Sequence, residues 1–211
     1  MRKILFVISY LDCGGAERAL ASITTHLPKE YEIDIILNGR RPVEFPYRGN
    51  LLYLDIDEEP KMASLLFHLK ILYRRWKKLY KLKKSNEYMA CISFLDSANI
   101  ANILTGNKNC KTIISVRNSL KEQSILPQYK YVVIPLVRMF YQRADKVTAV
   151  SQGIYTELID DFRLKKNKVI VIENGYDLEQ LKKAKGESFS QDETDFVKGK
   201  RVIATVGRLI P

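Results

Sequence analysis

The sequence predicts an α/β protein built on a doubly wound parallel sheet with helices on both faces. Two observations lead to this prediction. Apolar stretches of strand length alternate with helical patterns from residue 1 to residue 177, which is typical of parallel sheets. The chain of 211 residues is also 46% hydrophobic and 28% charged, which is ordinary for a globular protein and sufficient for a buried core.

Strands are expected where short apolar stretches end at turns, and helices where apolar residues recur three or four positions apart. The expected strands are residues 4–8, 31–37, 51–54, 88–94, 111–116, 146–150 and 168–172. The expected helices begin near residue 16 and then cover 62–80, 97–104, 136–143 and 152–160. Asp96 or Ser97 is expected to cap the third of these helices, and Ser151 the last.

The end of the chain differs in character from the rest. We expect residues 1–181 to form one domain, because residues 182–200 are polar and charged and indicate a linker. Residues 201–206 are again apolar and predict a strand. A strand with no helix or neighbouring strand after it exposes its edges, so residues 201–211 are interpreted as the first strand of a truncated second domain.

A glycine-rich turn follows the first strand. Gly14 and Gly15 stand where the chain passes from this strand into a helix, and glycine permits a positive φ and a close approach to a ligand. The free N–H groups of the first helical turn favour an anion such as a phosphate. Glu17 falls in that turn, where the helix dipole favours a carboxylate. The two glycines also fit a tight turn with no ligand.

The cysteines indicate the cellular compartment. Cys13, Cys91 and Cys110 are odd in number and lack metal-ligand spacing, which indicates reduced thiols in a cytosolic setting and no metal site. The sequence also has no stretch that approaches the roughly 18 consecutive apolar residues of a membrane span.

The positive charge is concentrated in one segment. The formal net charge is +11, and residues 61–84 contain nine basic residues and no acidic one. Apolar and aromatic residues fall on one arc of a helix here, and most basic residues on the opposite arc. This pattern fits a helix at an anionic membrane surface, with the headgroups contacted by Arg74, Trp76, Lys77, Lys78 and Lys81. It equally fits a surface helix that packs its apolar side on the sheet and points its lysines to solvent.

Polar residues follow the strand at 111–116. Arg117, Asn118 and Ser119 come directly after it, at the sheet edge where ligands of open parallel sheets bind. An arginine beside an amide and a hydroxyl is suited to bind an anion or a sugar. The same residues also fit a polar strand end that caps the next segment.

Six segments together resemble a known family. They are GGAER at 14–18, SFL at 93–95, SVRN at 115–118, ADKVTAVS at 144–151, IENGYD at 172–177 and VGRL at 206–209. In this order and spacing they resemble the amino-terminal half of the family 4 glycosyltransferases, which are retaining, nucleotide-sugar-dependent enzymes of the GT-B fold.

The resemblance implies two Rossmann-like domains across a cleft, with the acceptor held mainly by the first and the nucleotide sugar mainly by the second. It implies that Gly14, Gly15, Glu17 and Arg208 contact the donor phosphates or the acceptor, and that Arg117, Asn118 and Ser151 contact the acceptor. Many relatives carry a histidine near the end of the strand that here ends at Val116, whereas His26 and His68 fall in helices. No catalytic residue is therefore assigned.

The resemblance and the basic segment predict the amino-terminal part of a retaining glycosyltransferase of the hexosyltransferase type. Its donor is expected to be a nucleotide sugar, namely a UDP-sugar, and its acceptor a lipid-linked glycan or polysaccharide in surface polysaccharide or glycolipid synthesis. No metal or other cofactor and no nucleic acid is expected. The expected location is the cytoplasm, peripheral at the inner face of the plasma membrane.

Two other functions fit parts of the sequence. A stand-alone membrane-binding or acceptor-binding module, acting with a separate catalytic subunit, would use the same basic segment. A nucleic-acid-binding protein would also be basic, but a helix that contacts DNA has no need of the continuous aromatic side of residues 61–84.

Overall fold

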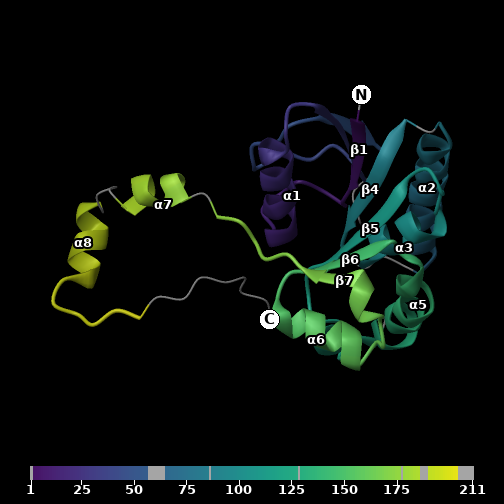
Figure 1. Cartoon of the computed structure of the whole chain (residues 1–211). Helices are drawn as coiled ribbons and strands as arrows, with labels where there is room; N and C mark the ends of the chain where they lie inside the picture. The colour runs from purple at the N-terminus through teal and green to yellow at the C-terminus, as the bar shows by residue number, and fades with distance from the viewer. Residues whose placement is uncertain are drawn as a thin grey trace. The chain divides into compact units, whose positions relative to one another are not determined.

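The computed structural model describes residues 2–56, 65–85, 87–127, 129–176, 178–185 and 190–203. The chain divides into two compact units, residues 1–175 and residues 176–211. The first unit contains the whole sheet and the helices that cover it (Figure 1).

Seven parallel strands form the sheet of the first unit. They are β1 (Arg2–Val7), β2 (Tyr31–Leu37), β3 (Asn50–Tyr53), β4 (Tyr88–Phe94), β5 (Lys111–Val116), β6 (Lys146–Ala149) and β7 (Val169–Val171). Their order is β3-β2-β1-β4-β5-β6-β7, and every neighbouring pair is parallel. The predicted doubly wound parallel sheet is confirmed. The strand order reverses between β1 and β4, and the carboxyl ends of these strands mark the place where open α/β sheets bind ligands.

Helices cover both faces of this sheet. Those of the first unit are α1 (Gly15–His26), α2 (Leu65–Lys84), α3 (Asp96–Leu104), α4 (Leu120–Gln123), α5 (Ile134–Phe140) and α6 (Gln152–Asp160). The π-helical turn η1 (Tyr129–Val133) precedes α5, and the 3-10 turns η2 (Tyr141–Arg143) and η3 (Lys166–Lys168) precede β6 and β7. Figure 1 shows α1 on one side of the sheet and α2 and α3 on the other.

Strand β1 shows how the sequence produces these layers. Its residues alternate between the two faces because successive side chains of a strand point in opposite directions. Ile4 and Phe6 pack in a buried cluster with Leu20 of α1. Leu5 and Val7 pack on the other face in a cluster with Leu79 of α2. The central strand is therefore buried on both sides, which explains its unbroken apolar sequence.

The helix starts agree only partly with the prediction. Ser151 caps α6 as expected, with its hydroxyl oxygen accepting a hydrogen bond from the Ile154 N–H at 3.3 Å. The predicted cap by Asp96 or Ser97 is wrong. Leu95 occupies the cap position, and its side chain makes no capping hydrogen bond. The side chains of Asp96 and Ser97 bond instead to Tyr141 and Arg75. Leu95 has a φ of 71°, a strained conformation for a residue with a branched side chain.

The second unit contains α7 (Leu178–Lys185) and α8 (Gln191–Val197). Both helices overlap the predicted linker at 182–200. Helix α8 begins with a capping box, in which Ser190 accepts from the Glu193 N–H at 3.3 Å and Glu193 accepts from the Ser190 N–H at 2.8 Å. Residues 201–203 are not in a strand, and the rest of the predicted strand, together with Arg208, lies outside the described residues.

Candidate functional site

Three loops run side by side at the carboxyl edge of the sheet. Backbone hydrogen bonds connect them: the Asn38 N–H donates to the Ser9 oxygen at 2.9 Å, and the Ile56 N–H to the Asn38 oxygen at 3.0 Å. The Glu44 N–H also donates to the Leu11 oxygen at 3.1 Å. The loops after β1, β2 and β3 therefore form one surface next to the point where the strand order reverses.

The glycine turn lies on this surface, but its conformation differs from the expectation. Gly14 occupies the position before α1 with φ −98° and ψ 164°, and neither Gly14 nor Gly15 has a positive φ. A Cβ on Gly14 would lie 1.9 Å from Oε2 of Glu17, so the small residue provides space for the Glu17 carboxylate. A Cβ on Gly15 would meet nothing within 4 Å. The turn thus combines a carboxylate at the helix N-terminus with an open approach at Gly15.

Arg117 lies at the carboxyl end of β5. Its guanidinium donates to Oδ1 of Asn174 and lies 5.7 Å from the centre of the Phe94 ring. Burial lowers the pKa of Arg117, and the charge of Glu17 opposes this shift. The end of β5 and the start of α1 therefore share one electrostatic environment.

The other two predicted acceptor residues are placed differently. Asn118 is exposed at the end of β5. The Ser151 hydroxyl is half-buried and occupied as the cap of α6. Their contact with an acceptor stays a prediction.

The side chain of Arg75 reaches the same edge from α2, which the sequence did not predict. It is fully buried and donates to the Asn38 amide oxygen at 2.6 Å, to the Ser97 hydroxyl at 2.8 Å and to the Ser9 hydroxyl at 3.3 Å. Within the described part of the chain its Nε has no hydrogen-bond partner, and burial lowers the pKa of Arg75 to about 10. A fully buried guanidinium held by neutral oxygens therefore stands between the ends of β1, β2 and β4.

Three further arginines contact the end of β3 and the loops after β1 and β3. The Arg41 guanidinium stacks 3.7 Å from the centre of the Tyr10 ring and lies 3.4 Å from Oδ2 of Asp12. Arg40 lies 4.3 Å from the centre of the Tyr53 ring and 3.8 Å from Oδ1 of Asp55. The side chain of Arg74 donates to the Asp55 backbone oxygen at 2.9 Å. The sequence signal for this group was the pair Arg40-Arg41 in a loop after a strand.

A half-buried carboxyl group lies at the start of α3. Asp96 accepts a hydrogen bond from the Tyr141 hydroxyl at 2.8 Å, and that hydroxyl accepts from the Asn99 amide at 3.3 Å. Burial raises the pKa of Asp96, while hydrogen bonds from Tyr141 and Tyr129 act in the opposite direction. The residue before it is Leu95, with its strained positive φ.

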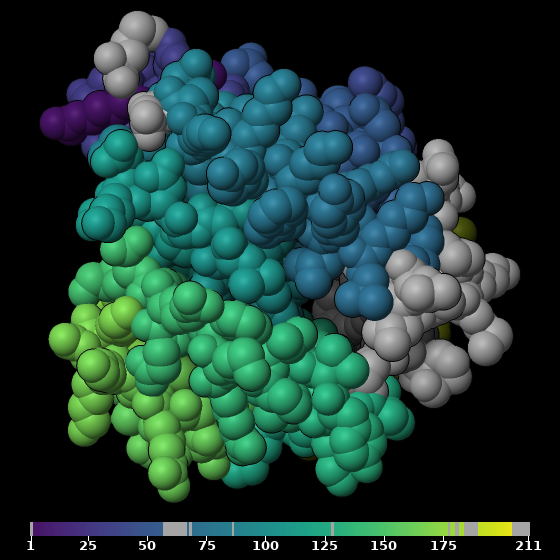
Figure 2. Space-filling view, turned by 90° about the vertical axis from the view of Figure 1, so that its right-hand side faces the viewer, coloured from purple at the N-terminus to yellow at the C-terminus, as the bar shows by residue number. Residues whose placement is uncertain are grey.

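The outer face of α2 is aromatic and basic. Tyr73, Trp76 and Tyr80 form a continuous stack, with ring centres 6.1 Å and 5.5 Å apart. Tyr73 is 58% exposed and Tyr80 49% exposed, so the aromatic side of the helix faces solvent and does not pack on the sheet. Figure 2 shows this face with α2 in blue. We refer to the three rings as the aromatic stack.

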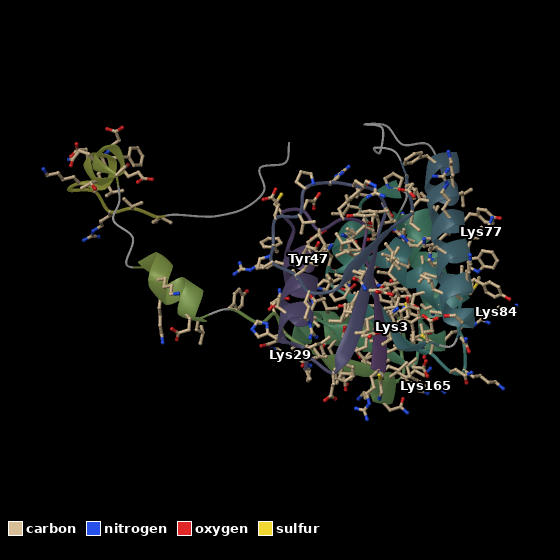
Figure 3. All side chains as sticks on the ribbon, turned by 90° about the horizontal axis from the view of Figure 1, so that it is seen from above. Lys3, Lys29, Tyr47, Lys77, Lys84 and Lys165 are labelled. Carbon is tan, nitrogen blue, oxygen red and sulfur yellow. The ribbon has the colours of Figure 1, made fainter. Side chains whose placement is uncertain are left out.

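The lysines of α2 divide between its two sides. Lys77, Lys81 and Lys84 are exposed, and Figure 3 shows Lys77 and Lys84 pointing away from the sheet. Lys78 is half-buried. Lys83 is buried and donates to the Asn102 backbone oxygen at 2.9 Å, to the Asn102 amide oxygen at 2.6 Å and to the Thr112 hydroxyl at 3.4 Å. Most basic residues were expected opposite the apolar arc, but Arg75 and Lys83 lie on the buried inner face with Ile71 and Leu79.

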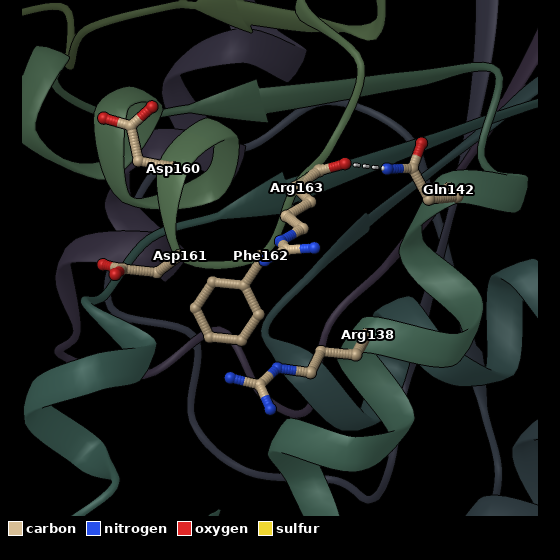
Figure 4. Close-up of a pocket in the computed structure, with 6 residues that line it drawn as sticks. All are labelled: Arg138, Gln142, Asp160, Asp161, Phe162 and Arg163. Carbon is tan, nitrogen blue, oxygen red and sulfur yellow. Dashed lines mark hydrogen bonds between the residues drawn. The ribbon is translucent and has the colours of Figure 1, made fainter.

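A separate hollow lies away from these residues. It is lined by Arg138, Gln142, Asp160, Asp161, Phe162 and Arg163, from the end of α5, from η2 and from the end of α6 (Figure 4). The Gln142 amide donates to the Arg163 backbone oxygen at 2.6 Å across it. None of the predicted site residues lines this hollow.

Among the residues that the structure describes, no helix combines the length and the apolar character that crossing a membrane requires.

Solved structures of low sequence identity share this fold. Anabaena HepE, crystallised in complex with UDP and glucose, matches 88% of this chain and 50% of its own at 18% identity and a TM-score of 0.56. Sucrose-phosphate synthase from Thermosynechococcus elongatus matches 85% of this chain and 49% of its own at 12% identity and a TM-score of 0.60.

Curated relatives match by sequence. A Campylobacter jejuni alpha-1,4-N-acetyl-D-galactosaminyltransferase, whose name gives a glycan on PP-undecaprenol as its substrate, is 36% identical over 61% of this chain and 35% of its own length. A second Campylobacter jejuni enzyme, named as a diphospho-undecaprenol 4-alpha-N-acetylgalactosaminyltransferase, is 26% identical over 86% of this chain and 50% of its length. The chain thus spans half or less of these relatives. The model of Glycosyltransferase Family 4 matches residues 13–180, and the chain belongs to that family.

Proposed function

We propose that this chain is the acceptor-side part of a retaining glycosyltransferase that moves a sugar from a nucleotide-sugar donor to a lipid-linked glycan at a membrane surface. The observation that supports it best is the outer face of α2, where the aromatic stack and exposed lysines stand on the helix that also reaches the carboxyl edge through Arg75. The curated relatives whose names include undecaprenol carriers support the same acceptor class.

The exposed face of α2 has the composition of a membrane-surface helix. Tyrosine and tryptophan are favoured at the level of lipid headgroups, because their rings are apolar and their polar atoms remain hydrated. Each lysine near an anionic surface contributes about 1 kcal/mol, so Lys77, Lys81 and Lys84 together would contribute on the order of 3 kcal/mol. Helix α2 would then hold the protein at the membrane that contains its acceptor.

The carboxyl edge provides groups suited to sugar transfer. A departing diphosphate requires fixed hydrogen-bond donors, and the N–H groups of the first turn of α1 can serve, because a Cβ on Gly15 would meet nothing within 4 Å. Arg117 lies at the carboxyl end of β5, at the same edge of the sheet. On this proposal the donor is a UDP-sugar, and Arg208 is one of the residues that bind its phosphates. The linker and the start of the second domain follow residue 181. Because of these substrates, the proposed location is the cytoplasmic face of the plasma membrane.

The single tryptophan allows a direct test of membrane binding. Trp76 is the only tryptophan and belongs to the aromatic stack, so its fluorescence reports on this face alone. We expect the emission to shift to shorter wavelength with vesicles of phosphatidylglycerol and phosphatidylcholine at low salt, and not with pure phosphatidylcholine. The variant Lys77→Glu, Lys78→Glu, Lys81→Glu should bind these vesicles at least tenfold more weakly.

A charge-matched variant provides the control. Lys108, Lys165 and Lys166 are exposed and lie outside α2, so changing all three to glutamate alters the net charge equally. This control should bind anionic vesicles nearly as well as the wild type. If it loses binding as strongly as the α2 variant, the interaction depends only on net charge and the proposed membrane face is wrong.

A stand-alone acceptor-binding module would bind the same vesicles. It is distinguished by activity: the protein in which this chain continues into a donor-binding domain should release UDP from a UDP-sugar only when lipid-linked acceptor is present. A module would release none under any condition.

A further inference from the structure

The separate hollow at the ends of α5 and α6 has the size of a small-molecule site. Its volume is about 580 Å³, within the range of roughly 300–1,000 Å³ found for ligand pockets. It is lined by η2 and by residues 160–163, which come before β6 and β7 in the chain and not after their carboxyl ends. A ligand in this hollow would therefore leave the candidate site free.

Two exposed guanidiniums of this hollow have no anion to neutralise them. Arg138 lies 5.8 Å from the centre of the Phe162 ring, and Figure 4 shows the side chain of Arg163 turned toward the same ring. Neither arginine forms an ion pair among the residues that the structure describes. Asp161 is paired instead with Lys121, at 3.4 Å between Oδ2 and Nζ. Two like charges beside one ring repel each other, and a shared anion would relieve that repulsion.

Arg163 has a backbone conformation that arginine rarely adopts. Its φ is 57°, in the left-handed region, and it follows the end of α6, where glycine is the usual residue. The buried neighbours Phe162 and Leu164 fix the chain on both sides, and the Gln142 amide donates to the Arg163 oxygen at 2.6 Å. An arginine here costs conformational energy that glycine would avoid. A guanidinium required in the hollow explains why this strain is kept.

An acceptor group lies apart from the two guanidiniums. Asp160 makes no hydrogen bond or ion pair within the described part of the chain, and Figure 4 shows its carboxylate pointing away from Arg138 and Arg163. An ionised carboxylate only accepts hydrogen bonds, so it fits a hydroxyl group of a ligand and repels an anion. The hollow thus offers donors for an anion in one part and an acceptor for a hydroxyl in another.

We infer that this hollow binds a phosphate monoester of a sugar or of a similar polyhydroxyl compound. Each guanidinium can donate two parallel hydrogen bonds to a phosphoryl group, so Arg138 and Arg163 bind the phosphate together. Asp160 accepts from a hydroxyl of the sugar, which occupies the rest of the hollow. The inference does not depend on the proposed function, because it uses neither α2 nor the carboxyl edge of the sheet.

Calorimetric titration of the 211-residue chain with glucose 6-phosphate tests this site. We expect Arg138→Gln, Arg163→Gln to bind this probe at least tenfold more weakly than the wild type. The control Lys165→Gln, Lys166→Gln removes the same charge from exposed residues of the next turn that do not line the hollow, and it should stay within threefold of the wild type. Absence of binding by the wild type, or equal losses in the two variants, overturns the inference.

Inorganic phosphate tests the sugar part of the ligand. The wild type should bind glucose 6-phosphate about fivefold more tightly than inorganic phosphate, because one hydrogen bond to Asp160 is added. In Asp160→Ala this ratio should fall to about one, and the ratio cancels the effect of the lost negative charge on both anions. If the wild type binds both probes equally, or if Asp160→Ala keeps the ratio, the assignment to a sugar phosphate is overturned.

Arg163→Gly separates binding from folding. Glycine adopts the left-handed conformation without strain, so this variant should unfold at the same or a higher urea concentration than the wild type. It should nevertheless bind glucose 6-phosphate at least fivefold more weakly, because one of the two guanidiniums is gone. A lower urea midpoint together with unchanged binding would make Arg163 a structural residue and overturn its role in the hollow.

Discussion

Buried charges are held differently at the two edges of the sheet. Near the amino edge, Asp34 of β2 accepts from Lys3 at 3.0 Å, from the Tyr88 hydroxyl at 2.5 Å and from the Asn50 amide at 3.1 Å. Lys83 has three oxygen acceptors there. At the carboxyl edge, among the residues that the structure describes, the Nε of Arg75 has no hydrogen-bond partner, and the Asp96 carboxyl accepts from the neutral Tyr141 hydroxyl.

The two edges therefore serve different purposes in one core. The amino edge satisfies its charges within the protein and stabilises the fold. The carboxyl edge, where ligands of parallel sheets bind, contains charged groups whose hydrogen bonds are not all made within the protein. Such groups favour the binding of a ligand. Substitutions at the amino edge should thus change stability, and substitutions at the carboxyl edge should change binding or pH dependence more than stability.

The largest loss of stability is expected for Asp34→Ala. Removing the carboxylate leaves the buried Tyr88 hydroxyl and the Lys3 ammonium without their acceptor, which should lower the free energy of unfolding by about 3 kcal/mol. Urea denaturation followed by circular dichroism measures this value. Glu32→Ala, an exposed position in the same strand, is the control and should change it by less than about 0.5 kcal/mol. Equal losses of stability in Asp34→Ala and Glu32→Ala would contradict the stabilising role of Asp34.

A smaller loss is expected for Lys83→Met. Methionine fills a similar volume but leaves the Asn102 and Thr112 oxygens without a donor, which should cost about 2 kcal/mol. Binding of the anionic vesicles should not change, because the Lys83 side chain is buried on the inner face of α2. Lys84→Met at the exposed neighbouring position should leave stability nearly unaltered. A loss of vesicle binding in Lys83→Met would contradict a purely structural role for Lys83.

Arg75→Met should cost less than Lys83→Met. The substitution removes three hydrogen bonds but also removes a desolvated charge whose Nε has no partner among the described residues, so the free energy of unfolding should fall by no more than about 1 kcal/mol. Urea denaturation of the two variants, measured side by side, checks this order. An Arg75→Met variant less stable than Lys83→Met would mean that both edges hold their buried cations in the same way.

Much of the fold could be predicted because its signals are local. The strands at 31–37, 88–94 and 111–116 were predicted with the bounds they have, since short apolar stretches between turns mark buried parallel strands. The cap at Ser151 was also predicted from a local pattern. Leu95 was not, because a positive φ at a leucine is imposed by packing and has no sequence signal.

The candidate site was predicted less completely. Arg117 and the glycine turn were found because they follow strands, whereas Arg75 was hidden in a basic segment interpreted as solvated. Its spacing of four residues from both Ile71 and Leu79 was the available signal for burial. The turn itself was recognised, but the local contact between Gly14 and the Glu17 carboxylate was not, because it depends on the rotamer of Glu17.

The smallest effect is expected for Asp96→Asn, and it lies in the pH dependence. Burial raises the pKa of Asp96 above its ordinary value, so the folded state binds this proton more tightly than the unfolded state. Stability from Asp96 is therefore present at low pH and lost as the pH rises from about 4 through the folded-state pKa. Burial acts to raise the pKa of Asp34, but hydrogen bonds from Tyr88, Lys3 and Asn50 outweigh it and lower this pKa, so the stabilisation from Asp34 is lost as the pH falls.

The two carboxyl groups should thus give opposite slopes. Asparagine at 96 can still accept from the Tyr141 hydroxyl, so Asp96→Asn should be as stable as the wild type at pH 4 and slightly more stable, by less than about 1 kcal/mol, at pH 7. Asp34→Asn should lose stability at pH 7 and approach the wild type as the pH falls. Urea denaturation measured across this pH range tests both slopes. If Asp96→Asn is less stable than the wild type at pH 7, the carboxyl edge satisfies its own charge as the amino edge does.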